Sequence, residues 1–449
     1  MNTYSTFQPA GFWQCLRSYA VTFLLLFAAF YFLLFLVYFI PTNLMYDEVE
    51  TSTETLSSQG LWYCLVGNDA GDMIDNFTIA DMLNIAVHND GDIWQRPLLG
   101  GSGGYSENND QIAMLGSGYN QPVRNFYEYY WHGWLIIIKP LLTYFDLVQI
   151  QQLFLIAMFA LAGYACFEIS RWGKSYAVSL GFALFLVGFW RTAVSLPNSF
   201  AFYIALLGCI VVSQHERRSI ASGDSPNLLW LGICFFVLGA LTNYFDFLDT
   251  PPITLGLPLL VLLIARRPNL KDMRWRDLVL LVAATCVSWT LGYGLLFASK
   301  WILGTIVTGD HVLTDAINEF IYRSGTTTWA VEGGLSFSRA DVIARNIDTL
   351  LPTWVYVPLA VLLIAYVVIL RRKGIQGLSL QFMVCVLVVS AIPFAWFCIA
   401  SNHSYVHYWF TYRDLIVTCF GIFLLLGGLI RLDDEGRPTV GKRYISPGE

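Results

Sequence analysis

Charged residues are scarce in this chain of 449 residues, because Asp, Glu, Lys and Arg together make up only 13% of it. Soluble proteins carry about twice that fraction, roughly 25%. Hydrophobic residues reach 56%, and apolar runs of about 15 to 25 residues recur along the whole chain, which is long enough for helices to cross a bilayer. The composition therefore excludes a soluble globular protein and predicts an all-α, polytopic membrane protein.

Several motifs of soluble enzymes are also missing. The chain has no P-loop and no GxGxxG pattern, so cytosolic nucleotide use is not expected. It also has no HExxH zinc motif. Its nine cysteines form no CxxC pair, and most of them lie in apolar runs, where cysteine usually behaves as a small hydrophobic residue. We expect no disulfide framework and no nucleic-acid partner.

The apolar runs and the basic loops between them predict ten spans with both termini inside, since Lys and Arg favour cytoplasmic loops. Arg171 and Lys174 fall on the inner side only if residues 129–145 form a helix on the outer membrane surface and do not cross. The predicted spans are residues 16–40, 147–166, 175–194, 199–213, 227–247, 252–265, 277–298, 352–370, 378–400 and 412–430.

The loops divide the chain into four parts. Residues 41–133 contain 13 acidic residues but only Arg96 and Arg124 as basic ones, which favours an extracytoplasmic position. We predict, in this order, a transmembrane module, a second extracytoplasmic loop, the C-terminal transmembrane helices, and a cytoplasmic tail. Their bounds are 1–300 (including the first extracytoplasmic loop, 41–146), 301–351, 352–431 and 432–449.

Polar residues in unusual places gather at the predicted outer ends of the spans. Because these ends belong to different spans, and sites are usually built on loops between packed elements, we expect the residues to line one outward cleft. They are Asp47, Glu48, His132, Lys139, Arg191, Asp246, Asp249, His403, His407 and Arg413.

The adjacent carboxylates of Asp47 and Glu48 follow the first span by only a few residues. Charges so close to lipid are costly and call for a reason. A catalytic or metal-binding role is one reading, and a solvated acidic loop is the other.

Two further pairs have spacings that place their members on one helical face. Asp246 and Asp249 are three residues apart, before Pro251, and suit a carboxylate pair for a metal or for substrate hydroxyl groups, or two solvated cap residues. His403 and His407 are four apart and suit a metal or phosphate group, or an interfacial aromatic belt.

His132 stands in a dense aromatic segment, 130–134, which suits either stacking on sugar rings or anchoring at the membrane surface. Lys139 and Arg191 lie near the predicted headgroup level. They could pair with a lipid phosphate, or extend to water without a specific partner.

This layout resembles the GT-C superfamily of polytopic glycosyltransferases, in which a carboxylate motif directly follows the first span. Tyr46-Asp47-Glu48 occupies that position, and the segment 128–142, with YYWHGWLIIIKPLL at its core, is similar to the family's approach to the second span. The late outer loop, 300–351, also fits. The longer motifs of the mannosyl and aminoarabinose transferase branches are missing, and FDFLDTPPITLG and NHSYVHYWFTYR resemble segments of uncharacterised bacterial membrane proteins.

The resemblance implies a multi-pass enzyme of a bacterial plasma membrane, surrounded by membrane lipids. It would transfer a sugar from a polyprenyl-phosphate-linked donor to a cell-surface glycan, lipid or protein acceptor. Asp47 or Glu48 would act as the base or hold a divalent cation, Mg or Mn, while Arg413, Arg191 and Lys139 would stabilise the leaving phosphate. Sugar, acceptor and oligomeric state stay open.

The alternative is a transporter or flippase of lipid-linked sugars or polymers, and a third is a scaffold or export partner. Charged residues are scarce at mid-span, where transport sites normally lie. That scarcity favours the enzyme.

Overall fold

The computed structural model describes residues 7–8, 11–65, 70–89, 91–106, 110–329, 333–352, 355–375 and 377–429. Within these residues eight helical stretches are long and apolar enough to cross a membrane, which confirms a helical, multi-pass membrane protein. The predicted tail, 432–449, lies outside the described residues. The eight stretches are Phe12–Val37 (α1), Leu147–Ser170 (α7), Leu196–Ala221 (η3 and α10), Leu228–Phe245 (α11), Pro252–Leu270 (α12), Trp275–Thr308 (α13), Leu380–Ile399 (α17 and α18) and Tyr408–Leu429 (α20, η5 and α21).

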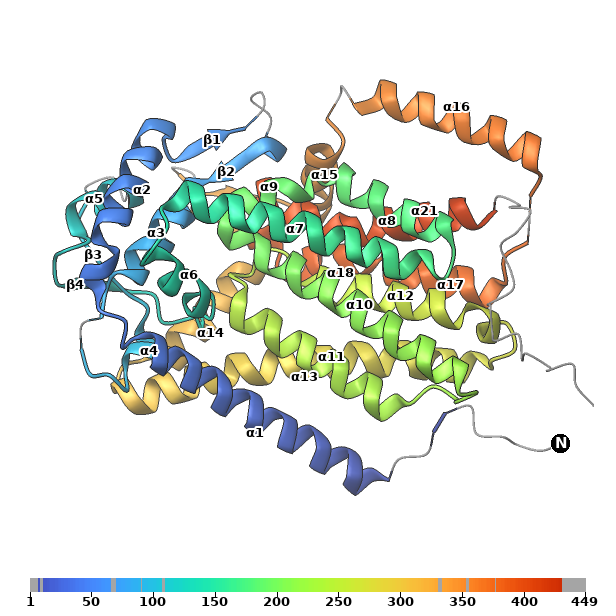
Figure 1. Ribbon diagram of the computed structural model, residues 1–449, viewed down its shortest axis with the longest axis horizontal. Coiled ribbons are helices and arrows are strands. Elements are labelled where there is room, and N and C mark those ends of the chain that lie inside the picture. The colour runs from blue at the N-terminus through green and yellow to red at the C-terminus, as the bar shows by residue number, and fades with distance from the viewer. Residues whose placement is uncertain are drawn as a thin grey trace, which may run out of the picture.

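Two of the ten predicted spans are not among these eight. The run 175–194 divides into α8 (Lys174–Leu186) and α9 (Phe189–Val194) at Gly188, whose φ is +62°. The 13 residues of α8 reach about 20 Å at 1.5 Å each, which is shorter than a bilayer core of about 30 Å. The other run is α16 (Tyr356–Lys373), which ends in three basic residues and lies apart from the bundle in Figure 1. The count of ten therefore stays a prediction.

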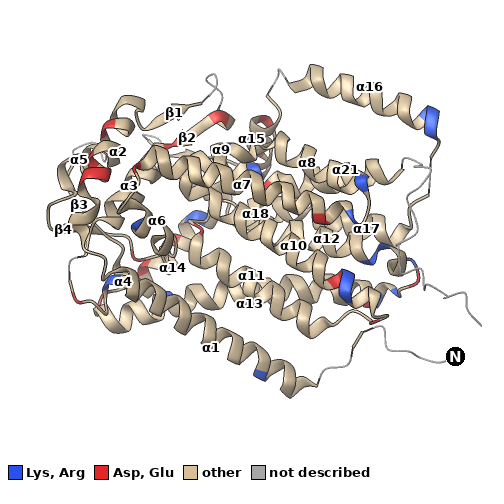
Figure 2. Cartoon of the chain, viewed as in Figure 1, with Lys and Arg blue, Asp and Glu red and all other residues tan. Residues whose placement is uncertain are grey.

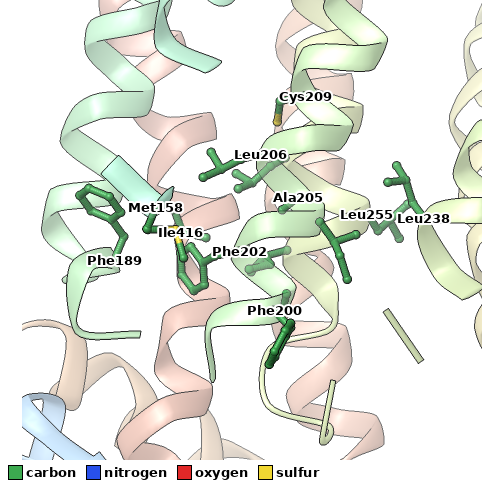
Figure 3. Close-up of a cluster of buried hydrophobic side chains, with 14 of the residues drawn as sticks. Met158, Phe189, Phe200, Phe202, Ala205, Leu206, Cys209, Leu238, Leu255 and Ile416 are labelled. Carbon is green, nitrogen blue, oxygen red and sulfur yellow. The ribbon is translucent and has the colours of Figure 1, made fainter. Parts of the chain in front are cut away.

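The long helices lie side by side along the horizontal axis of Figure 1, and the elements of the first loop cover one end of the bundle. Glycines allow the closest approach. A Cβ on Gly239 of α11 would lie 2.1 Å from the Trp289 carbonyl oxygen, and one on Gly292 of α13 would lie 2.0 Å from the Phe236 carbonyl oxygen. In lipid no hydrophobic effect drives helices together, and small residues at helix crossings instead allow close van der Waals packing. Figure 3 shows apolar side chains that fill the core between α7, α10, α11 and α12.

The first loop folds into short elements that cap the bundle. Two antiparallel pairs form, one joining Trp62 to Asp75 and the other Gly101 to Phe126. In place of one surface helix over 129–145, the structure has an irregular segment followed by α6, which is half the predicted length. The elements are η1 (Thr42–Met45), α2 (Tyr46–Gln59), β1 (Trp62–Cys64), η2 (Ala70–Asp72), β2 (Met73–Asp75), α3 (Asn76–Ala86), α4 (Arg96–Leu99), β3 (Gly101–Gly103), α5 (Gln111–Gly118), β4 (Val123–Phe126) and α6 (Leu135–Leu142).

The second loop contributes two amphipathic helices, α14 (Val312–Ser324) and α15 (Arg339–Leu350), joined by the pair β5 (Thr327–Thr328) and β6 (Leu335–Ser336). Ser338 caps α15 in a reciprocal capping box with Asp341. The helix packs against α19 (Ser401–Val406), α20 (Tyr408–Thr411) and η5 (Tyr412–Leu415), and it also touches η2 of the first loop. Both loops therefore meet the start of the last apolar stretch.

Candidate functional site

The site is built around the turn 246–251, which joins α11 to α12. Asp246 ends α11, and Pro251 and Pro252 begin α12. Between them Leu248 adopts a φ of +71°, a left-handed conformation that a bulky residue rarely takes. Such strain persists only where the surroundings hold it, and it concentrates at functional sites. The Leu248 carbonyl oxygen accepts a hydrogen bond of 2.9 Å from Nε2 of His403, which holds the turn against α19.

Three buried carboxyl groups gather at this turn, those of Asp246, Asp249 and Asp414. Both carboxylate oxygens of Asp414, and Oδ2 of Asp249, lack a hydrogen-bond partner among the described residues, whereas the Asp246 carboxylate faces backbone N–H groups of its own turn. Asp414, from η5, lies within electrostatic reach of the other two. Buried polar groups in native proteins almost always have partners, so several orphans in one place indicate a site that something else completes.

Burial raises the pKa of two of these carboxyl groups, so they keep their protons at a higher pH than exposed aspartates do. It raises the pKa of Asp246 to about 7, although the backbone N–H groups of Leu248, Asp249 and Thr250 partly offset the effect. It also raises the pKa of Asp249 well above the usual value, and the neighbouring Asp246 carboxylate raises it further. Two like charges this close do not ionise together readily, so the pair titrates as one system.

His403 is neutral and its tautomer follows from its partners. Nε2 faces a carbonyl oxygen and must donate, while Nδ1 lies 2.8 Å from a guanidinium nitrogen of Arg323 and must accept. Burial lowers the pKa of His403 well below its usual value, and His407 and Arg323 add to the effect. Its ring centre lies 4.8 Å from that of His407. Burial likewise lowers the pKa of His407, to about 3.

Two arginines connect the site to the first loop through one backbone oxygen. The Gly71 carbonyl accepts hydrogen bonds from Nη1 of Arg191 at 3.1 Å, Nη2 of Arg413 at 3.4 Å and the Tyr412 hydroxyl at 2.9 Å. Arg191 also pairs with Asp72 at 2.6 Å. Arg413 is fully buried and lies within electrostatic reach of Asp249. Arg413 therefore borders the buried carboxyl groups, and Arg191 lies next to Arg413 through the shared Gly71 carbonyl.

Six of the ten candidate residues thus come together: Arg191, Asp246, Asp249, His403, His407 and Arg413. His132 borders the group without joining it, because its ring packs 5.5 Å from that of Phe247 and its Nε2 lies 2.6 Å from the Tyr127 carbonyl oxygen.

The other three candidates have separate surroundings. Lys139 is buried, with Nζ 2.5 Å from Oδ1 of Asn89 and 4.9 Å from the centre of the Tyr38 ring, so it ties α6 to the end of α1. Asp47 is exposed and Glu48 half-buried in the first turn of α2. Carboxylates are favoured at that position in any helix. No contact links them to the buried carboxyl groups among the described residues.

Sequence reasoning missed Asp414 and Arg323. Asp414 directly follows Arg413 and looks like an ordinary counter-charge for it, whereas the structure pairs Arg413 with carbonyl oxygens. Arg323 stands in a loop of mixed charge, and no sequence signal singles it out.

Metal binding was one expectation for these carboxylates and histidines. Among the described residues no group of three or more His, Cys, Asp or Glu is arranged to hold a metal ion. A divalent cation stays a prediction.

No family model, curated protein or solved structure matches this chain. The chemistry has to come from the site itself. A cluster of carboxyl groups that exchange a proton near neutral pH, beside neutral imidazoles and arginines, can move a proton, bind hydroxyl groups and stabilise an anion.

Proposed function

We propose that this protein is a membrane glycosyltransferase that moves a sugar from a polyprenyl-phosphate carrier to an acceptor hydroxyl group on the extracytoplasmic side. The observation that carries the proposal is the group of three buried carboxyl groups, Asp246, Asp249 and Asp414. Within it, Oδ2 of Asp249 and both oxygens of Asp414 have no hydrogen-bond partner among the described residues. Perturbed carboxyl groups in a built site are typical of acid–base catalysis.

In the proposed reaction the Asp246–Asp249 pair takes the proton of the acceptor hydroxyl group. The acceptor oxygen bonds to the anomeric carbon as the bond from that carbon to the phosphate oxygen breaks, and polyprenyl phosphate leaves. A base is most effective when its pKa lies near the working pH, and the pKa of Asp246 is raised to about 7. Arg413 and Arg191 stabilise the negative charge of the leaving phosphate.

Asp47 and Glu48 are the rival base in this reaction. They follow α1 closely, and Asp47 is exposed while Glu48 is half-buried. Variants of the two groups therefore compete in the same assay.

The proposed orientation rests on the distribution of charge. Figure 2 shows acidic residues on the first-loop helix α2, while Lys and Arg mark the ends of α16 and of several long helices that point away from the first loop. Lys and Arg favour the cytoplasmic side. We propose ten spans, with α8 and α9 together as one and α16 as another, in a bacterial plasma membrane.

The enzyme is favoured over a transporter by where the buried charges lie. Transport sites usually lie near the bilayer midplane. Asp246 and Asp249 instead flank the junction of α11 and α12, and a buried ion pair, Glu216 with Arg266, lies near the far ends of α10 and α12.

The test uses purified full-length protein with a polyprenyl-phosphate-linked sugar and a mixture of cell-surface glycans. A glycosyltransferase releases free polyprenyl phosphate and adds the mass of one sugar to the acceptor. A flippase breaks no bond, so release of no polyprenyl phosphate in the presence of every acceptor would contradict the proposal. Chelation followed by addition of Mg or Mn tests the cation in the same assay.

A further inference from the structure

A cavity of about 500 Å³ opens beside the site, between α15, the first loop and the segment after α19. Its walls include Arg345, Asp348 and Thr349 of α15, together with Tyr405 and Tyr408. Gly71 also lines it, and the Gly71 carbonyl is the oxygen that Arg191, Tyr412 and Arg413 share. Pockets for small ligands have volumes of about 300–1,000 Å³. The cavity therefore suits a ligand of one or two sugar rings.

Arg345 is held in one orientation by aromatic rings. Its guanidinium carbon lies 3.7 Å from the centre of the Tyr408 ring and 4.6 Å from that of Tyr405. Tyr405 in turn stacks on Phe337, with ring centres 3.9 Å apart and planes 5° apart. A guanidinium stacked on rings in this way is fixed in place while its N–H edge stays able to donate.

The charge of Arg345 is not neutralised within the described part of the chain. No carboxylate there forms an ion pair with it, although Asp341 and Asp348 lie about one turn away on the same helix. Asp341 instead accepts hydrogen bonds from the Ser338 backbone and hydroxyl group. Arg345 therefore differs from Arg191, which is paired with Asp72, and from Arg413, which donates to backbone carbonyls.

We propose that this cavity binds an anionic sugar group, with Arg345 as the residue that holds its negative charge. The edge of a guanidinium binds a carboxylate or phosphate through two parallel hydrogen bonds. Asp348 can accept from sugar hydroxyl groups, and the Thr349 hydroxyl can accept or donate. The inference rests on the proposed function and deepens it, because it gives the substrate a charge.

Two substrates of the proposed reaction can supply an anionic sugar group. One is an acidic sugar at the end of the acceptor glycan, and the other is the sugar phosphate of the lipid-linked donor. The experiment measures binding of four probes to the full-length protein in lipid nanodiscs by calorimetry. The probes are glucuronate, glucose 1-phosphate, glucose and farnesyl phosphate.

We expect both anionic sugars, or the phosphorylated one together with farnesyl phosphate, to bind at least tenfold more tightly than glucose. Preference for glucuronate identifies the acceptor, and binding of farnesyl phosphate identifies the donor. Arg345→Gln should weaken the anionic probes at least tenfold. The matched control is Arg339→Gln on the same helix, because Arg339 lies outside the cavity and donates to the Cys398 carbonyl oxygen; it should bind like the wild type.

A second variant keeps the test independent of the stack on Tyr405 and Tyr408. Asp348→Ala leaves that stack untouched and should weaken the anionic sugars several-fold without changing the binding of farnesyl phosphate. The proposal is overturned if glucose binds as well as the anionic sugars, if no anionic probe binds, or if Arg345→Gln changes nothing.

Failure of this inference and failure of the proposed function give different results. Asp246→Asn should lower transfer by about 100-fold or more and leave anion binding in the cavity intact. If Arg345→Gln loses binding but no variant or wild-type protein transfers sugar, the cavity assignment stands and the transferase is wrong.

Discussion

Two groups of buried charges lie at opposite ends of α12, and they differ in how well they are satisfied. Near its far end Arg266 donates to the Glu216 carboxylate, the Ser219 hydroxyl and the Asp224 carbonyl oxygen. At its start, the carboxyl groups of Asp246, Asp249 and Asp414 are one another's neighbours, and Asp249 and Asp414 have oxygens without a partner among the described residues. The first arrangement stabilises the helix bundle. The second costs stability, and a protein keeps such a cost where chemistry requires it.

The largest expected effect breaks the second group. Asp246→Asn should lower transfer by about 100-fold or more, because a general base contributes 10²–10⁴-fold. The folded protein should be at least as stable as the wild type, since an amide has no charge to bury. The measurement is release of polyprenyl phosphate at equal amounts of folded protein, with the exposed Asp310→Asn as control. Wild-type transfer by Asp246→Asn would remove the buried group from the mechanism.

Breaking the first group should act on stability alone. Glu216→Gln leaves the Arg266 guanidinium buried without its counter-charge, and removal of one partner from a buried pair costs about 3–5 kcal/mol. The matched control is Arg276→Gln, whose side chain is 80% exposed and 3.7 Å from Asp277, where the loss should stay below about 1 kcal/mol. Thermal unfolding in detergent measures both. Equal losses would mean that the two pairs do not differ in burial as the structure has them.

The pH dependence of stability sharpens the comparison. The pKa of Asp246 is raised from 3.8 to about 7 in the folded protein, so between these values the folded state holds a proton that the unfolded state has released. The free energy of unfolding should therefore fall as pH rises from about 4 to about 7. Asp246→Asn should remove much of this slope, whereas Asp272→Asn, on the exposed loop before α13, should keep it. A wild-type slope in Asp246→Asn would contradict the raised pKa.

The smallest expected effect concerns the exposed carboxylates. Asp47→Asn should change the free energy of unfolding by about 0.5 kcal/mol or less, as exposed substitutions usually do. We expect transfer to stay within about tenfold of wild type. Loss of transfer in this variant, together with retention in Asp246→Asn, would instead assign the base to the pair at the start of α2.

The sequence predicted the membrane class, because long apolar runs are local signals. The pairs Asp246–Asp249 and His403–His407 were found through their spacing, and both belong to the site. Their structural setting could not be read in the same way. The left-handed backbone of Leu248 depends on the tertiary contact with His403, and nothing in the residue type indicates it.

Tertiary structure also changed the apparent character of single residues. Lys139 looks like a membrane-surface cation in the sequence, yet its side chain is buried against Asn89 and Tyr38. The predicted span 175–194 is one apolar run, but Gly188 divides it, because a glycine in the left-handed region ends a helix. Arg323 is recognised as part of the site only from the structure, in which α14 places its guanidinium against His403.

The Gly71 carbonyl also bears on the order in which the chain is made. Two of its donors, Tyr412 and Arg413, follow it by 341 and 342 residues, about three quarters of the length of the protein. Nearly every other apolar stretch has therefore left the ribosome before the Gly71 carbonyl can meet these two donors. The candidate site is assembled last, so a nascent chain lacks these contacts during its synthesis, and a chain that stops before residue 408 never acquires them.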